Sequence, residues 1–347
     1  MSKSVMEREK IRNSIIEQIG EKKLDVLSIA KEYNVSKQSI YKYIQKLVED
    51  GIVAVEKNGR ANTYKLTNTI QRFQVAIPFQ DEAIIFEKNI KPLLDDVSDI
   101  VYDCLGYAVQ GMLDNANEHS EGSRVDVSVM KSVYDVAITI ADDGVGIFNK
   151  VSAALDLPDK KYAILELAKG RFTTEPESHT GEGIFFSSKV VDRFAIISGG
   201  LEFVVNQDDK SIIDEIDYDR IGTMVVLIIH KNHAEKPADV FEKYKSDPFC
   251  DNYGFDKTIV PVRLLEYGND RPLVVSRSQA RRLMARVDRF INIVLDFEGI
   301  DEIGQGFADE IFRVFVNSHP EVELHPINCS EGTKKMIQWV SGDRFIN

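Results

Sequence analysis

The chain has 347 residues, a formal net charge of −13 and a hydrophobic content of 43%. This length predicts two to three domains of roughly 150 residues, and the hydrophobic content excludes general disorder. The three cysteines have no paired spacing, which argues against a disulfide framework or a cysteine-rich zinc site and indicates a reducing compartment. The charged start predicts no secretory signal, and no run approaches 18 apolar residues, so we expect a cytoplasmic protein with no membrane contact.

The charge is distributed unevenly along the chain. Residues 1–70 contain 13 Lys and Arg against 9 Asp and Glu, whereas the rest contains 30 against 47. We therefore predict a domain boundary near residue 70. A second boundary is expected at residues 233–257, where Pro237, Pro248 and several charges interrupt a strand-like pattern. The predicted units are 1–70, 71–232 and 258–347, with 233–257 as a linker.

The first unit has the pattern of three helices and a hairpin. Isoleucines at helical spacing predict a helix that ends near Gly20, and a short second helix covers residues 27–33. Ser36 is a favourable N-cap for a third helix, which Gly51 terminates. Strands at 52–56 and 63–66 then flank a basic hairpin tip.

This pattern resembles the winged helix-turn-helix of bacterial transcription regulators. The resemblance implies that the third helix enters the major groove of DNA while the hairpin contacts phosphates or the minor groove. The residues expected to contact DNA are Ser36, Lys37, Gln38, Tyr41, Lys42 and Lys46 on the helix, with Lys57 and Arg60 on the hairpin. The alternative is a winged helix used only for protein contacts.

The middle unit contains separated polar and glycine-rich motifs. A predicted helix over 104–120 carries LDNANEHS, and strands at 124–130 and 133–140 run into ADDGVGI at 141–147. TGEGIFF at 180–186 opens another helix, and IGT at 221–223 opens the last strand. Glycines at such positions let a backbone approach a ligand closely, and a helix N-terminus favours phosphate.

The order of these motifs resembles the GHKL superfamily of ATP-binding domains, an α/β sandwich. The resemblance implies that Asn115 ligates Mg²⁺, that Asp142 accepts a hydrogen bond from the adenine amino group, and that Thr223 supports Asp142. It places Phe148–Thr180 as an ATP lid. The other residues expected at bound ATP are Gly144, Gly146, Ile147, Gly181, Gly183, Lys169 and Thr173. ATP and Mg²⁺ are therefore the expected cofactors.

One position departs from the family pattern. Hydrolysing members carry a glutamate four residues before the magnesium-binding asparagine, where it activates water. This chain has Gly111 there, which has no side chain to act as a base. Hydrolysis is therefore absent, slow or served by another carboxylate such as Asp114, because Glu118 would need a different approach geometry. His119 is expected to support the site, and the other histidines have no metal spacing.

The third unit alternates predicted strands and helices, typical of a small sheet covered by helices. Its segment IVLDFEGIDEIGQGFADEIF resembles the STAS-like domains of bacterial regulators. At the turn where anti-sigma antagonists carry a phosphorylated serine, this chain has Gly304-Gln305-Gly306, so phosphorylation is not expected there. The unit is a structural or oligomerising module, or one that senses a ligand or partner.

The sequence thus predicts a multidomain α+β protein that binds DNA through its first unit and Mg-ATP through its second. Our leading hypothesis is a nucleotide-responsive transcription regulator, expected to form a homodimer and to contact a protein through the STAS-like unit. One alternative is an anti-sigma-type protein serine kinase or slow ATPase. Another is an ATP-gated dimeric clamp in defence against foreign DNA.

Overall fold

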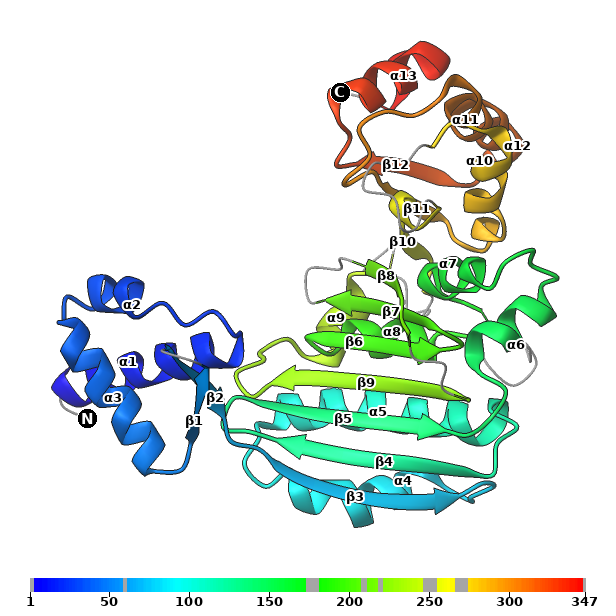
Figure 1. The fold of residues 1–347 in the computed structure, drawn as a ribbon. Helices are drawn as coiled ribbons and strands as arrows, with labels where there is room; N and C mark the ends of the chain where they lie inside the picture. Colours follow the sequence, from blue (N-terminus) through cyan, green and yellow to red (C-terminus); the bar gives the residue numbers. More distant parts are fainter. Residues whose placement is uncertain are drawn as a thin grey trace.

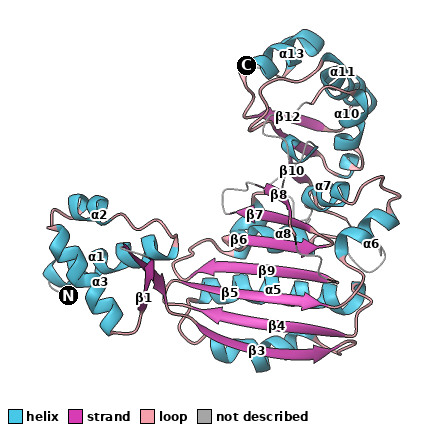
Figure 2. Cartoon of the chain, in the orientation of Figure 1, coloured by secondary structure: helices cyan, strands magenta, loops and turns pink. Residues whose placement is uncertain are grey.

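The computed structural model describes residues 3–58, 61–172, 181–206, 211–217, 221–245, 255–265 and 274–345. Within these residues the protein is a multidomain α+β structure with a two-stranded, a seven-stranded and a three-stranded sheet (Figures 1 and 2). Among the described helices, none has the length and apolar content needed to cross a membrane.

The N-terminal unit consists of three helices and a hairpin, in the order that the sequence predicts. The elements are α1 (Lys3–Gly20), α2 (Val26–Glu32), α3 (Lys37–Glu49), β1 (Val53–Asn58) and β2 (Ala61–Leu66). Ser36 caps α3, because its hydroxyl accepts a hydrogen bond from the Ser39 N–H at 3.2 Å. The isoleucines at 11, 15, 16 and 19 are buried in a core whose buried members all come from this unit, and Tyr134 of the middle unit packs against it.

The middle unit is built on the seven-stranded sheet, in which all neighbouring strands are antiparallel. In spatial order the strands are β3 (Thr69–Ala76), β4 (Arg124–Lys131), β5 (Asp135–Asp142), β9 (Thr223–His230), β6 (Arg193–Ser198), β7 (Leu201–Asn206) and β8 (Ser211–Glu215). Alternate residues of β4 and β9 are buried, so one face of the sheet packs on the core. The predicted boundary at residue 70 cuts into β3, which starts one residue earlier.

Helices cover one face of this sheet (Figure 1). The long helix α5 (Asp99–His119) contacts β5, β9 and α8 (Gly183–Lys189). It starts five residues before the predicted helix because Ser98 caps it by accepting from the Val101 N–H. The remaining helical elements are α4 (Glu82–Ile85), η1 (Phe86–Ile90), η2 (Lys91–Leu93), α6 (Ile147–Ala154), α7 (Lys161–Lys169) and α9 (Pro237–Glu242).

The C-terminal unit has a parallel sheet of order β10-β11-β12, with helices between the strands as predicted. Its strands are β10 (Lys257–Pro261), β11 (Asn292–Asp296) and β12 (Glu323–Ile327). Its main helices are α10 (Arg277–Met284), α11 (Gln305–Asp309) and α13 (Glu331–Ser341), and the π-helical η5 (Glu310–Phe315) and α12 (Val316–Ser318) continue α11. Short 3₁₀ turns are η3 (Val262–Leu265), η4 (Val287–Arg289) and η6 (Gly342–Arg344).

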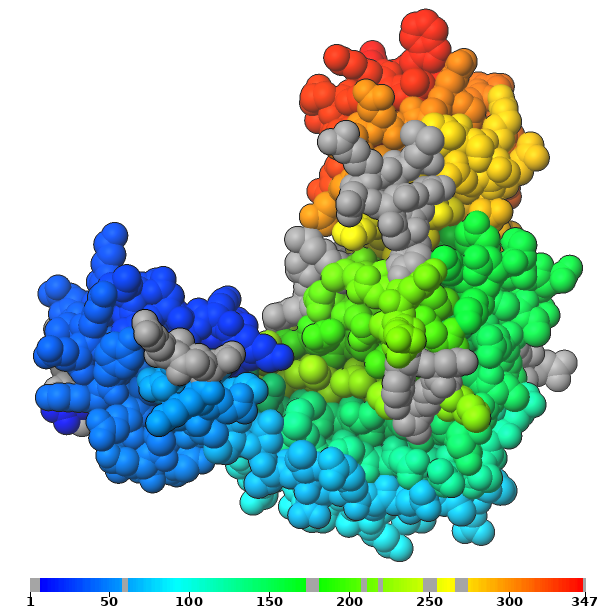
Figure 3. Space-filling view, in the orientation of Figure 1, coloured from blue at the N-terminus to red at the C-terminus, as the bar shows by residue number. Residues whose placement is uncertain are grey.

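The middle and C-terminal units share one hydrophobic core. A single cluster of buried side chains extends from Ile85 to Ile337, whereas the N-terminal core is separate. Part of the expected linker belongs to this cluster, because Tyr244 and Phe255 are both 3% exposed. Residues 233–257 are therefore no simple linker. In Figure 3 the N-terminal unit forms a lobe beside the body, while the C-terminal unit rests directly on the middle one.

Candidate functional site

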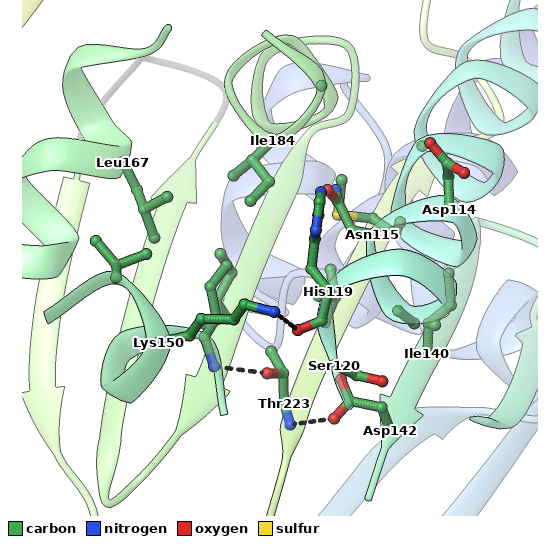
Figure 4. Close-up of a pocket in the computed structure, with 18 of the residues that line it drawn as sticks. Asp114, Asn115, His119, Ser120, Ile140, Asp142, Lys150, Leu167, Ile184 and Thr223 are labelled. Carbon is green, nitrogen blue, oxygen red and sulfur yellow. Dashed lines mark hydrogen bonds between the residues drawn. The ribbon is translucent and has the colours of Figure 1, made fainter. Parts of the chain in front are cut away.

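A cavity of about 330 Å³ opens between α5, α6, α7, α8 and the ends of β5 and β9 (Figure 4). It collects residues from motifs that are far apart in the sequence. The predicted site residues that line it are Asn115, Asp142, Gly146, Ile147, Gly181, Gly183 and Thr223. The chain segments that carry the three glycine-containing motifs thus meet at one place.

Asp142 is the fixed polar group at the floor of this cavity. The residue is 6% exposed, and its Oδ1 accepts hydrogen bonds from the backbone N–H groups of Gly144 (2.9 Å) and Thr223 (3.1 Å). The Thr223 hydroxyl accepts in turn from the Ile147 N–H at 2.9 Å. Because backbone groups hold both side chains, a ligand meets a carboxylate whose position is set in advance.

Two glycines permit this close packing. A Cβ atom on Gly144 would lie 1.9 Å from the carbonyl oxygen of Ser120, and one on Gly222 would lie 2.2 Å from that of Asp142. Gly222 also has a φ of +86°, which side-chain-bearing residues rarely adopt. Gly144, predicted to approach the nucleotide, is not among the residues that line the cavity. Its role in the structure is contact with the end of α5.

One stripe of α5 faces the cavity at intervals of four residues, namely Tyr107, Gly111, Asn115 and His119. A Cβ atom added at Gly111 would meet only the Ser187 hydroxyl, at 3.6 Å, an ordinary contact distance, so the position has room for a small side chain. Burial raises the pKa of Tyr107 to about 12, and the nearby Glu182 carboxylate acts in the same direction. The stripe therefore offers a phenol, an amide and the imidazole of His119, with no side chain on Gly111 to act as a base.

Lys150 is a cavity residue that sequence reasoning missed. Among the described residues that line the cavity it is the one lysine or arginine, alongside the carboxylates of Asp114, Asp142 and Glu182. Its ammonium donates to the carbonyl oxygen of His119 at 2.8 Å (Figure 4). It also pairs with Glu121 at 3.0 Å. Its place in the helix after DDGVGI was the signal available in the sequence.

Lys169, predicted as a phosphate contact, is elsewhere. It is 2% exposed and absent from the cavity lining, and its ammonium pairs with Glu166 at 2.8 Å. It also donates to the carbonyl oxygens of Ala285 (2.9 Å) and Arg282 (3.2 Å). All three ammonium donors are thus used inside the protein, and the prediction was wrong. Thr173 and the rest of the expected lid beyond Phe172 lie outside the described residues.

The donor set around the cavity suits a magnesium ion brought by a ligand. No group of three or more His, Cys, Asp or Glu side chains in the described part of the chain could hold a metal by itself. Asn115 offers an amide oxygen at the cavity, with Asp114 beside it. Mg²⁺ commonly takes one or two protein oxygens and completes its shell with phosphate oxygens and water. Asn115 and Asp114 thus offer one or two oxygens to a Mg²⁺ ion whose other ligands a bound molecule and water would supply.

Two of the remaining histidines surround Asp192. His233 Nδ1 lies 2.9 Å from one Asp192 oxygen, and its Nε2 lies 3.0 Å from the carbonyl oxygen of Glu235. The hydrogen bond with Asp192 raises the pKa of His233 to about 10, with a smaller contribution from Cys104. His230 donates its backbone N–H to Asp192. This cluster joins β9 to the start of β6 and has a structural role.

The predicted DNA-contact residues lie largely on one exposed face of α3. The side chains of Lys37, Gln38, Tyr41, Lys42 and Lys46 are exposed, and so is Lys57 on β1. Lys46 is paired with Asp50 at 2.7 Å, and Ser36 is used as the cap, so these two are less available to a ligand. Arg60 lies outside the described residues.

Comparison with known proteins assigns one part of the chain. The model of a family described as a STAS-like domain of unknown function (DUF4325) matches residues 279–334, which confirms the STAS-like character of the C-terminal unit. No curated protein matches the chain. A solved crystal structure titled as a GntR-family transcriptional regulator is similar at 10% identity and a TM-score of 0.14, covering 64% of this chain and 92% of that one.

Proposed function

We propose that this protein is a DNA-binding transcription regulator whose middle unit is a GHKL-type domain that binds ATP with Mg²⁺. The observation that carries the proposal is the cavity in which Asp142, fixed by backbone hydrogen bonds, lies across from Asn115 on α5. A carboxylate held in this way can accept a hydrogen bond from the amino group of adenine, and a nucleobase of that kind has the size that such a cavity admits.

The other end of the nucleotide would lie toward α5 and the start of α8. Asn115 would ligate the magnesium ion, which neutralises phosphate charge when bound. Gly183 leaves the backbone at the start of α8 open to phosphate, since a Cβ there would meet nothing within 4 Å, whereas a Cβ at Gly181 would lie 2.5 Å from the Phe172 backbone. Lys150 would be a further contact for the phosphates. The triphosphate would lie near three carboxylates, so its negative charge requires a cation in addition to Mg²⁺.

The absence of a base at Gly111 favours nucleotide sensing over turnover. A second candidate, slow ATP hydrolysis, is kept because Asp114 and Glu182 also line the cavity and could orient water. A serine kinase that acts on the chain's own STAS-like unit is disfavoured by the Gly304-Gln305-Gly306 turn. We place DNA on the exposed basic face of α3 in a winged-helix mode, and a homodimer would present two such faces.

The proposal is tested by titrating Mg·ATP into the full-length chain in a calorimeter and analysing the nucleotide recovered afterwards. We expect saturable binding that Asn115→Ala weakens at least tenfold, and recovery of intact ATP. Gln110→Ala is the matched control, because Gln110 is on the same helix but does not line the cavity. Equal affinities for Asn115→Ala and wild type would refute this site, and phosphate release above the Asn115→Ala background would favour the slow ATPase.

A further inference from the structure

The helix α7 borders two parts of the molecule at once. Leu167 on this helix and Phe172 just after it line the cavity, and Figure 4 shows Leu167 directed toward it. The neighbouring side chains of Glu166 and Lys169 instead point to the C-terminal unit. Leu167 therefore lines the cavity, whereas its neighbours Glu166 and Lys169 contact the STAS-like unit.

The contact on the C-terminal side is a buried charged network. Glu166 and Lys169 are 4% and 2% exposed and pair with each other at 2.8 Å. Arg286 pairs with the second oxygen of Glu166 at 2.9 Å. Lys169 binds carbonyl oxygens at the C-terminal end of α10, where the helix dipole favours a cation. A network that is fully satisfied in this way requires one relative position of α7 and α10.

Further contacts fix the chain on either side of Lys169. The Thr258 hydroxyl of β10 donates to the Lys169 carbonyl at 2.7 Å. Arg171 and Arg289 exchange hydrogen bonds, each donating to the other's carbonyl oxygen, at 2.7 Å and 3.0 Å. The guanidinium of Arg282 lies 3.8 Å from the centroid of the Tyr162 ring at the start of α7.

Helix α8, on the other side of the cavity, has the same double role. Ile184 lines the cavity, whereas the next residue, Phe185, packs on Phe255 with ring centroids 4.5 Å apart. Phe255 in turn packs on Phe290 of the C-terminal unit at 5.1 Å. Arg171 follows α7 by two residues, and Glu182 directly precedes α8. The Nε atom of Arg171 lies 3.8 Å from Oε1 of Glu182. The two cavity-lining helices α7 and α8 are thus both attached to the STAS-like unit.

The N-terminal unit has a different attachment. Tyr134, at the turn between β4 and β5, packs against its core and against Gly20 at the end of α1. This contact lies at the beginning of β5, whereas Asp142 and the cavity lie at the end of the same strand. The STAS-like unit is therefore the nearer of the two to the cavity.

We propose that nucleotide occupancy of the cavity and the packing of the STAS-like unit on α7 are coupled, so that a change in this packing changes nucleotide affinity. This inference rests on the proposed function. Coupling is reciprocal. If nucleotide binding changes the position of α7 relative to the STAS-like unit, then a change in that position also changes the free energy of nucleotide binding. Since the shared core leaves little room for independent motion, α7 and α8 carry the change together.

The test measures the Kd for Mg·ATP of the full chain in the wild type, in Arg282→Ala/Arg286→Ala, and in Arg289→Ala. These arginines are at the surface of the contact, so Glu166 keeps Lys169 as its partner when Arg286 is removed. Arg281→Ala is the matched control, because Arg281 is on the same helix and pairs with Glu310 inside the C-terminal unit. Coupling predicts a change of about fivefold or more in the interface variants and less than twofold in the control.

Hydrogen exchange gives a second readout in the same proteins. Mg·ATP should change the protection of residues 282–291 in the wild type and should do so less in the double variant. Wild-type binding with equal Kd values in folded interface variants, and no exchange difference, overturns the coupling but leaves the proposed function standing. If the wild type does not bind Mg·ATP, the proposed function fails and the coupling fails with it.

Discussion

The carboxylate of Asp142 accepts a hydrogen bond from the backbone N–H of Thr223, 3.1 Å away, although 81 residues separate the two in the chain. This bond joins the ends of the adjacent strands β5 and β9 at the floor of the cavity. The Thr223 hydroxyl extends the link to Ile147 at the start of α6. The polar floor is therefore part of the framework and does not depend on a ligand for its shape.

Removing the Thr223 hydroxyl should weaken this framework. In Thr223→Ala the N–H of Ile147, a partly buried residue, loses its acceptor, which costs about 0.5–1.5 kcal/mol of unfolding free energy. Thr223→Ser keeps the hydroxyl and should lose much less. Urea denaturation followed by circular dichroism measures both. A Ser variant as unstable as the Ala variant would show that the methyl group, and not the hydrogen bond, is the important contact.

The glycines of the two motifs should differ in their tolerance of a methyl group. Gly144→Ala places Cβ 1.9 Å from the Ser120 carbonyl oxygen, so the end of α5 must move, at a cost of about 2 kcal/mol or more. Gly183→Ala meets nothing within 4 Å and should leave the unfolding free energy within about 0.5 kcal/mol. Thermal and chemical denaturation of both variants tests the contrast, which equal losses would contradict.

Lys150 should contribute to ATP affinity through the phosphates. Lys150→Met should weaken Mg·ATP binding about tenfold and leave adenosine binding unchanged, because adenosine carries no charge for the ammonium to contact. Lys131→Met is a close control. Lys131 also donates to a carbonyl oxygen, that of Leu93 at 2.8 Å, and pairs with Asp95, but it lies outside the cavity lining. Equal losses for ATP and adenosine would instead assign Lys150 to holding the end of α5.

The Asp192–His233 pair should make stability depend on pH in the alkaline range. The folded pKa of His233 is raised to about 10 from an ordinary value of 6.5. Its stabilising effect is therefore complete below pH 6.5 and is lost as pH rises toward 10. His233→Gln should be less stable at pH 6.5 and should flatten the fall in unfolding free energy between pH 6.5 and 10. Parallel pH profiles in the two proteins would show that the imidazole is not charged in the folded state.

The exposed face of α3 should govern DNA binding. Lys37→Ala/Lys42→Ala should lower affinity for duplex DNA and reduce the slope of log K against log salt by about two, if each lysine contacts one phosphate. Lys88→Ala, an exposed lysine in the middle unit, should change neither quantity. Fluorescence anisotropy over a salt series measures both. Unchanged affinity in the double variant would favour the alternative that this unit makes protein contacts.

Much of the secondary structure could be predicted, because local patterns set it. The isoleucine spacing of α1, the Ser36 cap and the long apolar face of α5 are each encoded within a few residues. The positions of Asn115, Asp142 and Thr223 around one cavity were expected from the motif order, and the cavity brings them together. Nucleotide binding itself stays a prediction.

The features that the sequence did not predict depend on contacts between segments that are distant in the chain. Lys169 follows an apolar run and looks like a free cation, but the carbonyl oxygens that bind it come from residues more than a hundred positions later. Tyr244 and Phe255 lie in a charged, proline-containing stretch, and only the packed fold shows them in the shared core. Lys150 stands one turn into a helix whose orientation the sequence does not specify.

The most direct measurement is a crystal structure of the full chain grown with Mg²⁺ and the non-hydrolysable analogue AMP-PNP. The account predicts one nucleotide in the cavity, with its adenine amino group on Asp142, its magnesium ion on Asn115 and its phosphates near Gly181 and Lys150. An empty cavity at saturating nucleotide, or a nucleotide bound elsewhere on the chain, would contradict the account.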